Sequence, residues 1–239
     1  MKAMLLAAPL IGVLCSAPVA QGAIISYTNQ TLTNPDVPRA LLLRLRNDNS
    51  EWGYAQRDPV SHEDFFGGNA GVQSHTVSVN FLLNRGITAD NFAVLLTVKE
   101  PLAKPRIEVT NFTLVFYDEN DQVISTANFT QDSPLLLTPV QPTPGKNGHV
   151  FDIGMTDDQR SNFFSNPANR IGIIVPEDSP ITRTQGGAEK FLIVAAANIP
   201  SPVSLALLEP AGACGMDIAV GDAQPFGIET SFGGPWCGS

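Results

Sequence analysis

The sequence has few charged residues, histidines and cysteines, and each shortage narrows what the protein can be. Only 15% of its 239 residues are charged and 43% are apolar, so the chain is too apolar to be disordered. Its three histidines do not form an H-E-x-x-H zinc-protease motif. A G-x-S-x-G nucleophile elbow, a P-loop and a dinucleotide-binding fingerprint are also missing. We therefore predict a folded protein that is not an enzyme and has no catalytic residues, metal or cofactor.

Positive charge is scarce as well. The chain has 14 Lys and Arg against 23 Asp and Glu, which gives a formal net charge of −9. An acidic chain repels the phosphates of nucleic acids and the surface of anionic membranes. We therefore expect neither nucleic acid nor a membrane surface as a partner.

The first residues have the pattern of a secretory signal peptide. Lys2 gives a positive start, Met4 to Val13 is mostly apolar, and Ala20-Gln21-Gly22 fits a small-residue cleavage site. The apolar run is too short to span a bilayer as a permanent helix. Leu14 stands where a lipobox needs a small residue before Cys15, so the pattern favours ordinary cleavage over lipidation. We predict that residues 1–22 are removed, which leaves a secreted or extracellular protein without a stable membrane span.

Only Cys214 and Cys237 remain after such a cleavage. Cysteines of exported proteins usually pair, because the compartment is oxidising. We predict a Cys214–Cys237 disulfide that closes a local loop near the end of the chain.

Short apolar or alternating segments separated by turn residues dominate residues 23–197. The predicted strands cover residues 24–32, 40–45, 75–83, 92–98, 107–117, 123–129, 150–153, 171–175 and 191–196. The 20 Gly and 19 Pro supply turn signals between them. This spacing favours an all-β fold, an antiparallel, jelly-roll-like β-sandwich with one short connecting helix.

Two local structures have clear sequence signals. The polar run Asp118 to Gln122 between two apolar segments predicts a β-hairpin, since Asn and Asp suit tight turns. Thr156 and Gln159 have the spacing of a capping box, which predicts a helix from Asp157 to Ser165 that packs on the sheet.

Two stretches, residues 46–74 and 131–148, are predicted to be long loops. The first contains Trp52, Tyr54, Phe65 and Phe66, which are our candidate ligand-binding residues because long loops often carry binding sites. The alternative is that these rings pack against the edge of the core. His62-Glu63-Asp64 lies in the same stretch. Neighbours on a strand point in opposite directions, so we interpret the triplet as solvated loop residues and not as metal ligands.

The segment from Asn198 to Leu208, with its Pro200-Ser201-Pro202 triplet, resembles the start of a PEP-CTERM sorting signal. The resemblance implies export in a Gram-negative bacterium, recognition by an exosortase and release to the cell surface or exopolysaccharide matrix. Ser201 replaces the family's Glu, Glu209-Pro210 interrupts the apolar helix, and no Lys or Arg follows Lys190. We therefore expect residues 198–239 to be a degenerate, poorly ordered tail, left by decay of the signal or by a frameshift.

These observations lead to a functional hypothesis with open alternatives. The leading hypothesis is a non-catalytic, secreted or cell-surface β-sandwich protein of the extracellular or exopolysaccharide matrix, with extracellular polysaccharide as candidate partner. A carbohydrate-binding module that stacks sugars on Trp52 and Tyr54 is the first alternative. A jelly-roll glycoside hydrolase and a filament subunit are further alternatives. The ligand, the oligomeric state and the strand order stay open.

Overall fold

The computed structural model describes residues 22–46, 48–100, 106–141, 143, 146–185 and 187–196. The predicted signal peptide up to Gln21 lies outside this part of the chain. The predicted disulfide partners and the sorting-signal-like triplet, Pro200, Ser201 and Pro202, also lie outside it. The division into signal peptide (1–22), strand-rich domain (23–197) and tail (198–239) stays a prediction.

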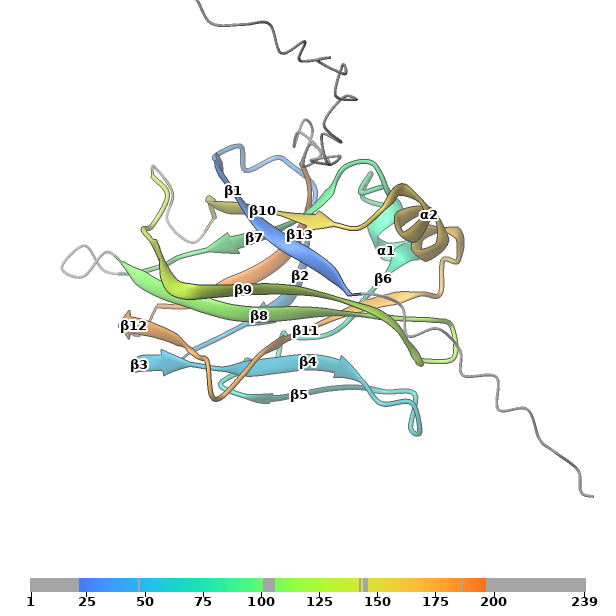
Figure 1. Cartoon of the computed structure of the whole chain (residues 1–239), viewed down its shortest axis with the longest axis horizontal. Helices are drawn as coiled ribbons and strands as arrows, with labels where there is room; N and C mark the ends of the chain where they lie inside the picture. Colours follow the sequence, from blue (N-terminus) through green and yellow to red (C-terminus); the bar gives the residue numbers. More distant parts are fainter. Residues whose placement is uncertain are drawn as a thin grey trace, which may run out of the picture. The chain divides into compact units, whose positions relative to one another are not determined.

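The described residues form a curled sheet and two short helices (Figure 1). The strands are β1 (Ala23–Leu32), β2 (Arg39–Arg44), β3 (Asp48–Glu51), β4 (Gly53–Arg57), β5 (Asp64–Gly68), β6 (Val77–Ser78), β7 (Phe92–Thr97), β8 (Ile107–Tyr117), β9 (Val123–Leu137), β10 (Gly148–Gly154), β11 (Arg170–Val175), β12 (Ile181–Gln185) and β13 (Lys190–Ala195). The helices are α1 (Val79–Leu83) and α2 (Asp157–Ser165).

The prediction of an antiparallel, jelly-roll-like sandwich is wrong. Hydrogen bonds connect the strands into one mixed sheet in the order β2-β13-β7-β10-β1-β9-β8-β11-β4-β5, to which β3, β6 and β12 attach. The pairing of β1 with β9 is parallel, whereas β1 pairs with β10 in the antiparallel sense. Because β1 hydrogen-bonds on both sides, it joins two antiparallel stretches that a sandwich would keep as separate sheets.

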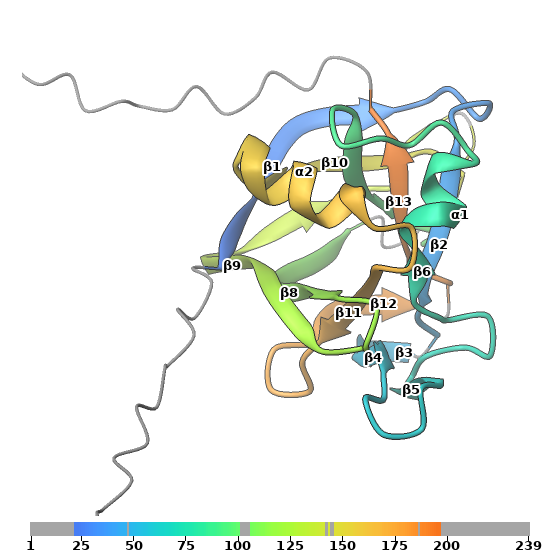
Figure 2. The same ribbon diagram turned by 90° about the vertical axis from the view of Figure 1, so that its right-hand side faces the viewer.

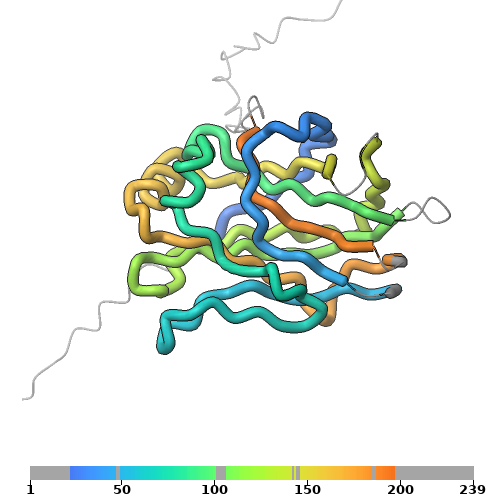
Figure 3. The backbone as a smooth tube through the Cα atoms, turned by 180° about the vertical axis from the view of Figure 1, so that it is seen from behind, coloured from blue at the N-terminus to red at the C-terminus, as the bar shows by residue number. Residues whose placement is uncertain are grey.

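The two ends of this sheet approach each other. Gly71 N donates to Arg44 O at 2.8 Å, and His75 N donates to Leu42 O at 3.1 Å. An isolated antiparallel bridge joins Leu45 to Ala70. Seen from behind, β13 lies beside β2, and the chain after β5 runs close to the end of β2 (Figure 3). The sheet therefore curls far enough for backbone hydrogen bonds to connect its first strand with the segment that follows its last.

A continuous apolar core lies inside the curl, with Phe112 near its middle. The Phe112 ring lies 5.1 Å from that of Phe129, 5.3 Å from Phe151 and 5.1 Å from Phe191. These four rings come from β8, β9, β10 and β13. The core thus connects strands from both antiparallel stretches, and its burial favours the curl.

Helix α2 confirms the capping-box prediction. Thr156 Oγ1 accepts from Gln159 N at 3.2 Å, while Gln159 Oε1 accepts from Thr156 N at 2.9 Å. The Phe163 ring packs 5.0 Å from that of Phe116, and the Phe164 ring 5.0 Å from that of Phe92. Figures 1 and 2 show α1 and α2 at the same end of the sheet.

Three local predictions differ from the structure. Residues 75–83 are not one strand, because the Ser78 hydroxyl accepts from Phe81 N at 3.2 Å and starts α1 after two strand residues. Residues 46–74 are not a long loop, since they contain β3, β4 and β5. β9 continues to Leu137, through part of the second predicted loop. The hairpin around residues 118–122 is confirmed, with β8 and β9 antiparallel.

The packing of α2 predicts that two phenylalanines contribute very differently to the stability of the fold. Phe163 is buried against Phe116, so Phe163→Ala should lower the free energy of unfolding by about 3–5 kcal/mol. Phe66 is 42% exposed, so Phe66→Ala should cost about 1 kcal/mol or less. Urea denaturation followed by circular dichroism measures both. Equal losses for the two variants would contradict this packing.

Candidate functional site

Two tight turns carry the polar side chains of the candidate site. In the β4–β5 turn, the Asp58 carboxylate accepts from Val60 N at 2.8 Å and from the Ser61 hydroxyl at 2.9 Å. These bonds hold the pKa of Asp58 below its usual value, with the Val60 amide as the largest cause. Such a turn folds locally, because an Asp side chain bonds the backbone two residues on.

The β8–β9 turn is also held by an Asp side chain that accepts from backbone amides. Asp118 Oδ1 accepts from Asn120 N and from Gln122 N, both at 2.8 Å. Asp121 in this turn has a φ of 62°, and His62 in the β4–β5 turn has a φ of 57°. Left-handed backbone is unfavourable for residues other than glycine, so both turns hold strained positions that aim these two side chains.

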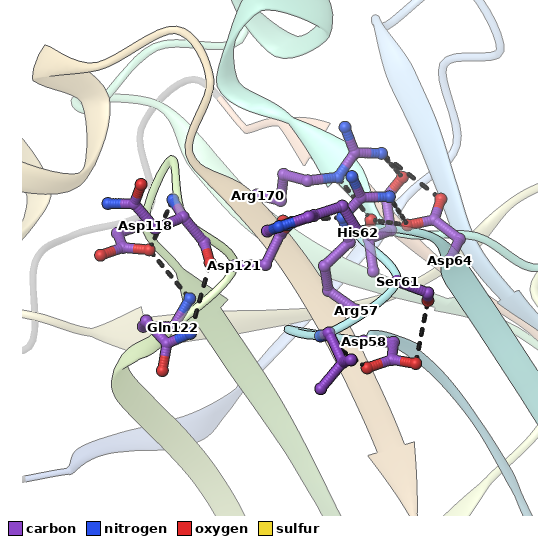
Figure 4. A network of polar contacts seen from close by, with 12 residues as sticks. Arg57, Asp58, Ser61, His62, Asp64, Asp118, Asp121, Gln122 and Arg170 are labelled. Atoms are coloured by element: carbon purple, nitrogen blue, oxygen red, sulfur yellow. Dashed lines mark hydrogen bonds and ion pairs between the residues drawn. The ribbon is translucent and has the colours of Figure 1, made fainter.

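The two turns meet in a network of charged side chains (Figure 4). Arg57 Nε donates to Asp121 Oδ1 at 2.7 Å, and His62 Nδ1 lies 2.6 Å from Asp121 Oδ2. Asp64, opposite Arg57 in the β4–β5 pairing, accepts from Arg57 at 3.4 Å and from Arg170 of β11 at 3.3 Å. Three separate parts of the chain therefore contribute to one charge cluster.

Thr76 fixes the second arginine of this cluster. Arg170 Nε donates to Thr76 Oγ1 at 2.7 Å, and Arg170 Nη2 donates to Thr76 O at 3.2 Å. The Thr76 hydroxyl in turn donates to Asp64. The planar guanidinium is thereby held between a carboxylate and the backbone, which restricts its orientation.

Burial and charge act in opposite directions on Asp121. Its side chain is only 6% exposed, and burial by itself would raise its pKa. Hydrogen bonds from Arg57 and His62 outweigh that effect and leave the pKa below its usual value. Asp121 is therefore ionised at neutral pH and acts as the acceptor that orients both partners.

His62 is the most exposed side chain of this network. Its side chain is 60% exposed, in contrast to that of Asp121. A carboxylate at Nδ1 favours the tautomer with the proton on that nitrogen, so Nε2 carries the lone pair. The Asp121–His62 pair thus has the arrangement of an oriented general base at the protein surface.

The interpretation of His62-Glu63-Asp64 as solvated loop residues was wrong for Asp64. Asp64 is the first residue of β5 and bridges two arginines. His62 contacts Asp121, a partner distant in sequence. Only Asp118 gave a local signal that was recognised in the sequence, and it located the β8–β9 turn without showing that this turn meets the β4–β5 turn. Among the described residues, no group of three or more His, Cys, Asp or Glu side chains could hold a metal ion.

The predicted aromatic ligand-binding residues are only partly brought together. Tyr54 and Phe65 lie edge to face with ring centroids 5.6 Å apart, on the outer side of the β4–β5 hairpin. The Trp52 ring covers Gly68, whose φ of 67° and close contact leave no space for a side chain. Phe66 pairs with the buried Ala55 and lies on the opposite face. A binding role for these rings stays a prediction.

Comparison with known proteins gives a family. The model of the glycine cleavage system P-protein family matches residues 114–239, which is more than half of the chain. The chain belongs to the glycine cleavage system P-protein family. No solved structure matches it.

The P-protein relatives are bacterial and much longer than the matched segments. A protein of Bacillus licheniformis, named "Probable glycine dehydrogenase (decarboxylating) subunit 1", is 39% identical over 99 residues, or 40% of this chain and 21% of that protein. A protein of the same name from Geobacillus kaustophilus is 58% identical over 50 residues, or 21% of this chain and 10% of that protein. One from Halalkalibacterium halodurans is 63% identical over 38 residues, or 16% of this chain and 8% of that protein. The chain thus spans about a fifth or less of these relatives.

Membership of the P-protein family corrects several predictions made from sequence. The PEP-CTERM resemblance is overturned, and so is the hypothesis of a secreted matrix protein with its carbohydrate-binding and glycoside-hydrolase alternatives. The prediction that the protein is not an enzyme is wrong for this family, whose relatives are named as a dehydrogenase. The predicted extracellular location and polysaccharide partner are contradicted by the same match. None of the described helices is long and apolar enough to cross a bilayer.

The matched P-protein segment is not a separate folding unit in the described part of the chain. Of its strands, β9 pairs with β1, β11 pairs with β4, and β13 pairs with β2 and β7. The candidate network crosses the same boundary, because Asp121 and Arg170 lie inside the match, whereas Arg57, His62 and Asp64 lie before it. The part before residue 114 therefore positions the polar residues of the matched part.

The network predicts that Arg57 and Asp121 are strongly coupled. A double-mutant cycle with Arg57→Ala and Asp121→Ala should give a coupling energy of about 1.5–3 kcal/mol, because Asp121 is nearly buried. The matched control is Arg183–Glu108, with the same 2.7 Å separation but a 60% exposed arginine. That pair should couple by about 1 kcal/mol or less. Equal couplings in urea denaturation would show that burial does not strengthen the Arg57–Asp121 contact.

Proposed function

We propose that this chain is a component of a glycine-decarboxylating enzyme and works together with at least one further polypeptide. The observation that supports this proposal is the family match over residues 114–239. The matched relatives are named as subunit 1 of a glycine dehydrogenase (decarboxylating), a name that implies a further subunit. The alignment with the B. licheniformis relative covers 21% of that protein.

The charge balance of the candidate site indicates that the network alone does not bind the carboxylate of glycine. Glycine carries a carboxylate, and an enzyme that decarboxylates it needs a positive group to hold that carboxylate in place. Arg57 and Arg170 are the arginines of the network, and Asp64 and Asp121 already neutralise them. The network therefore has no surplus positive charge for a substrate, and the carboxylate-binding group must come from outside it.

His62 is the residue of this chain that we assign to proton transfer in the assembled enzyme. Reactions that break bonds at the α-carbon of glycine include proton transfers, and a histidine oriented by a carboxylate is suited to transfer protons. Its exposed side chain can face a substrate bound mainly by the further polypeptide. Asp121 and Arg57 are positioning residues in this proposal, since they act through His62.

The test is complementation of a B. licheniformis strain whose subunit 1 lacks only the segment that this chain matches. Extracts that contain this chain should release labelled CO₂ from glycine labelled at the carboxyl carbon, whereas the purified chain alone should release none. His62→Gln should lower the release by about 10²-fold or more, the usual contribution of a general base. His75→Gln is the matched control, because His75 is bonded to the Gln73 carbonyl and lies outside the network.

The outcomes separate the parts of the proposal. If the chain is soluble and folded but the extract releases no more CO₂ than the strain without this chain, the decarboxylation proposal is wrong. CO₂ release that is unchanged in His62→Gln would agree with decarboxylation but would show that His62 takes no part in it. Release by the purified chain alone would show that a further polypeptide is not needed.

A further inference from the structure

Three glutamates from three segments are buried together at the opposite end of β4 from the candidate site. Glu51 ends β3, Glu100 follows β7, and Glu189 directly precedes β13. All three are buried, with Glu51 and Glu189 fully enclosed. Buried carboxyl groups are costly when they are charged, so such a cluster needs a specific arrangement.

The backbone around Glu189 ties these segments together. Glu189 O accepts from Leu45 N at 2.9 Å, and Glu189 Oε1 accepts from Lys99 N at 3.3 Å. Gly187 lies so close to the Lys99 carbonyl that a side chain there would collide with it. Residues 187–189 therefore lie against both the end of β2 and the segment after β7.

The carboxyl groups are also bonded to one another. The side chains of Glu51 and Glu100 act on the pKa of Glu189 through hydrogen bonding, that of Glu51 raising it and that of Glu100 lowering it. A carboxylate can only accept, so a hydrogen bond between two carboxyl groups requires that one of them carries a proton. Burial, followed by the hydrogen bond and charge of Glu51, raises the pKa of Glu189 to about 8.

Positive groups lie near the cluster on the neighbouring elements. They are Arg44 and Arg46 at the end of β2, Lys99 after β7 and Lys190 at the start of β13. Burial first, and then repulsion from the other three, lowers the pKa of Lys190. These cations favour ionised glutamates, yet the direct contacts of Glu189 are made with carboxyl groups and the Lys99 amide.

We propose that Glu51 and Glu189 share a proton at neutral pH and form a pH-sensitive latch that holds residues 187–189 against Leu45 and Lys99. Loss of this proton places two negative charges in contact inside the protein. Their repulsion releases the latch and opens the start of β13. This inference rests on the burial of the glutamates, the contacts of Glu189 and its raised pKa, and it does not depend on the proposed glycine decarboxylation.

The proton gives the latch a defined pH window. The unfolded chain loses the Glu189 proton near the ordinary value of 4.5, whereas the folded chain keeps it up to about 8. Between these values the folded state binds more protons than the unfolded state, so stability falls as the pH rises. The stabilisation is fully present below pH 4.5 and lost above about pH 8. The unfolding equilibrium constant should rise by up to about tenfold per pH unit inside this window.

The experiment compares the full chain with Glu189→Gln, because a glutamine keeps the size of the side chain and does not titrate. Urea denaturation from pH 5 to 9 should show the steep rise in the unfolding constant for the natural sequence and a flatter profile for Glu189→Gln. Glu63→Gln is the matched control, since Glu63 is exposed, and it should keep the natural profile. Hydrogen exchange should show that the Leu45 and Lys99 amides lose protection above about pH 8 only when Glu189 is present.

Carboxyl-carbon NMR of glutamate-labelled protein keeps the test decisive where Glu189→Gln fails to fold. Glu51→Gln then replaces it for the urea profiles, and the titration of Glu189 is followed directly in the natural sequence. A midpoint far above 4.5 supports the latch. A Glu189 midpoint near 4.5, or identical pH profiles for the natural sequence and the glutamine variants, overturns it.

Discussion

The short parallel pairing between β1 and β9 is the contact on which the rest of the architecture depends. Only Ala23↔Ala127 and Ile24↔Asn128 make up its register. On one side of this junction the strands run from β2 to β1, and on the other from β9 to β5, with antiparallel pairing throughout each side. Because the junction is short, the sheet can bend there, and the apolar faces of both stretches close over the core around Phe112.

The sequence predicted those elements whose deciding interactions lie within a few residues. The capping box of Thr156 and Gln159 fixed α2 at its observed bounds, and the Asp118 turn fixed the β8–β9 hairpin. The β1–β9 junction has no such local signal, because its partners lie far apart in sequence. Parallel strands are not joined by a tight turn, so no turn residues mark the pairing. The Ser78 cap was missed for a different reason. Residues 75–83 alternate like a strand, and one hydroxyl–amide bond outweighs that alternation.

The candidate site could be predicted only in fragments. The two aspartate-based turns are local, but their meeting depends on the pairing of β11 with both β4 and β8. That arrangement places Arg170 between the hairpins and lets Asp64 bridge two arginines. The functional hypothesis failed for a related reason. It rested on the two ends of the chain, whereas the family match runs from inside β8 to residue 239 and so includes one of those ends.

Both polar clusters lie across the boundary of the family match, and this shared feature joins the two halves of the chain. Asp121 and Arg170 belong to the matched segment, and their ion-pair partners Arg57 and Asp64 precede it. Glu189 likewise belongs to the match, whereas Glu51 and Glu100 precede it. A buried charge left without its partner costs more than the pair contributes. The described part of the matched segment therefore cannot keep this fold alone, because its strands would lose their neighbours and the buried Asp121 would lose Arg57.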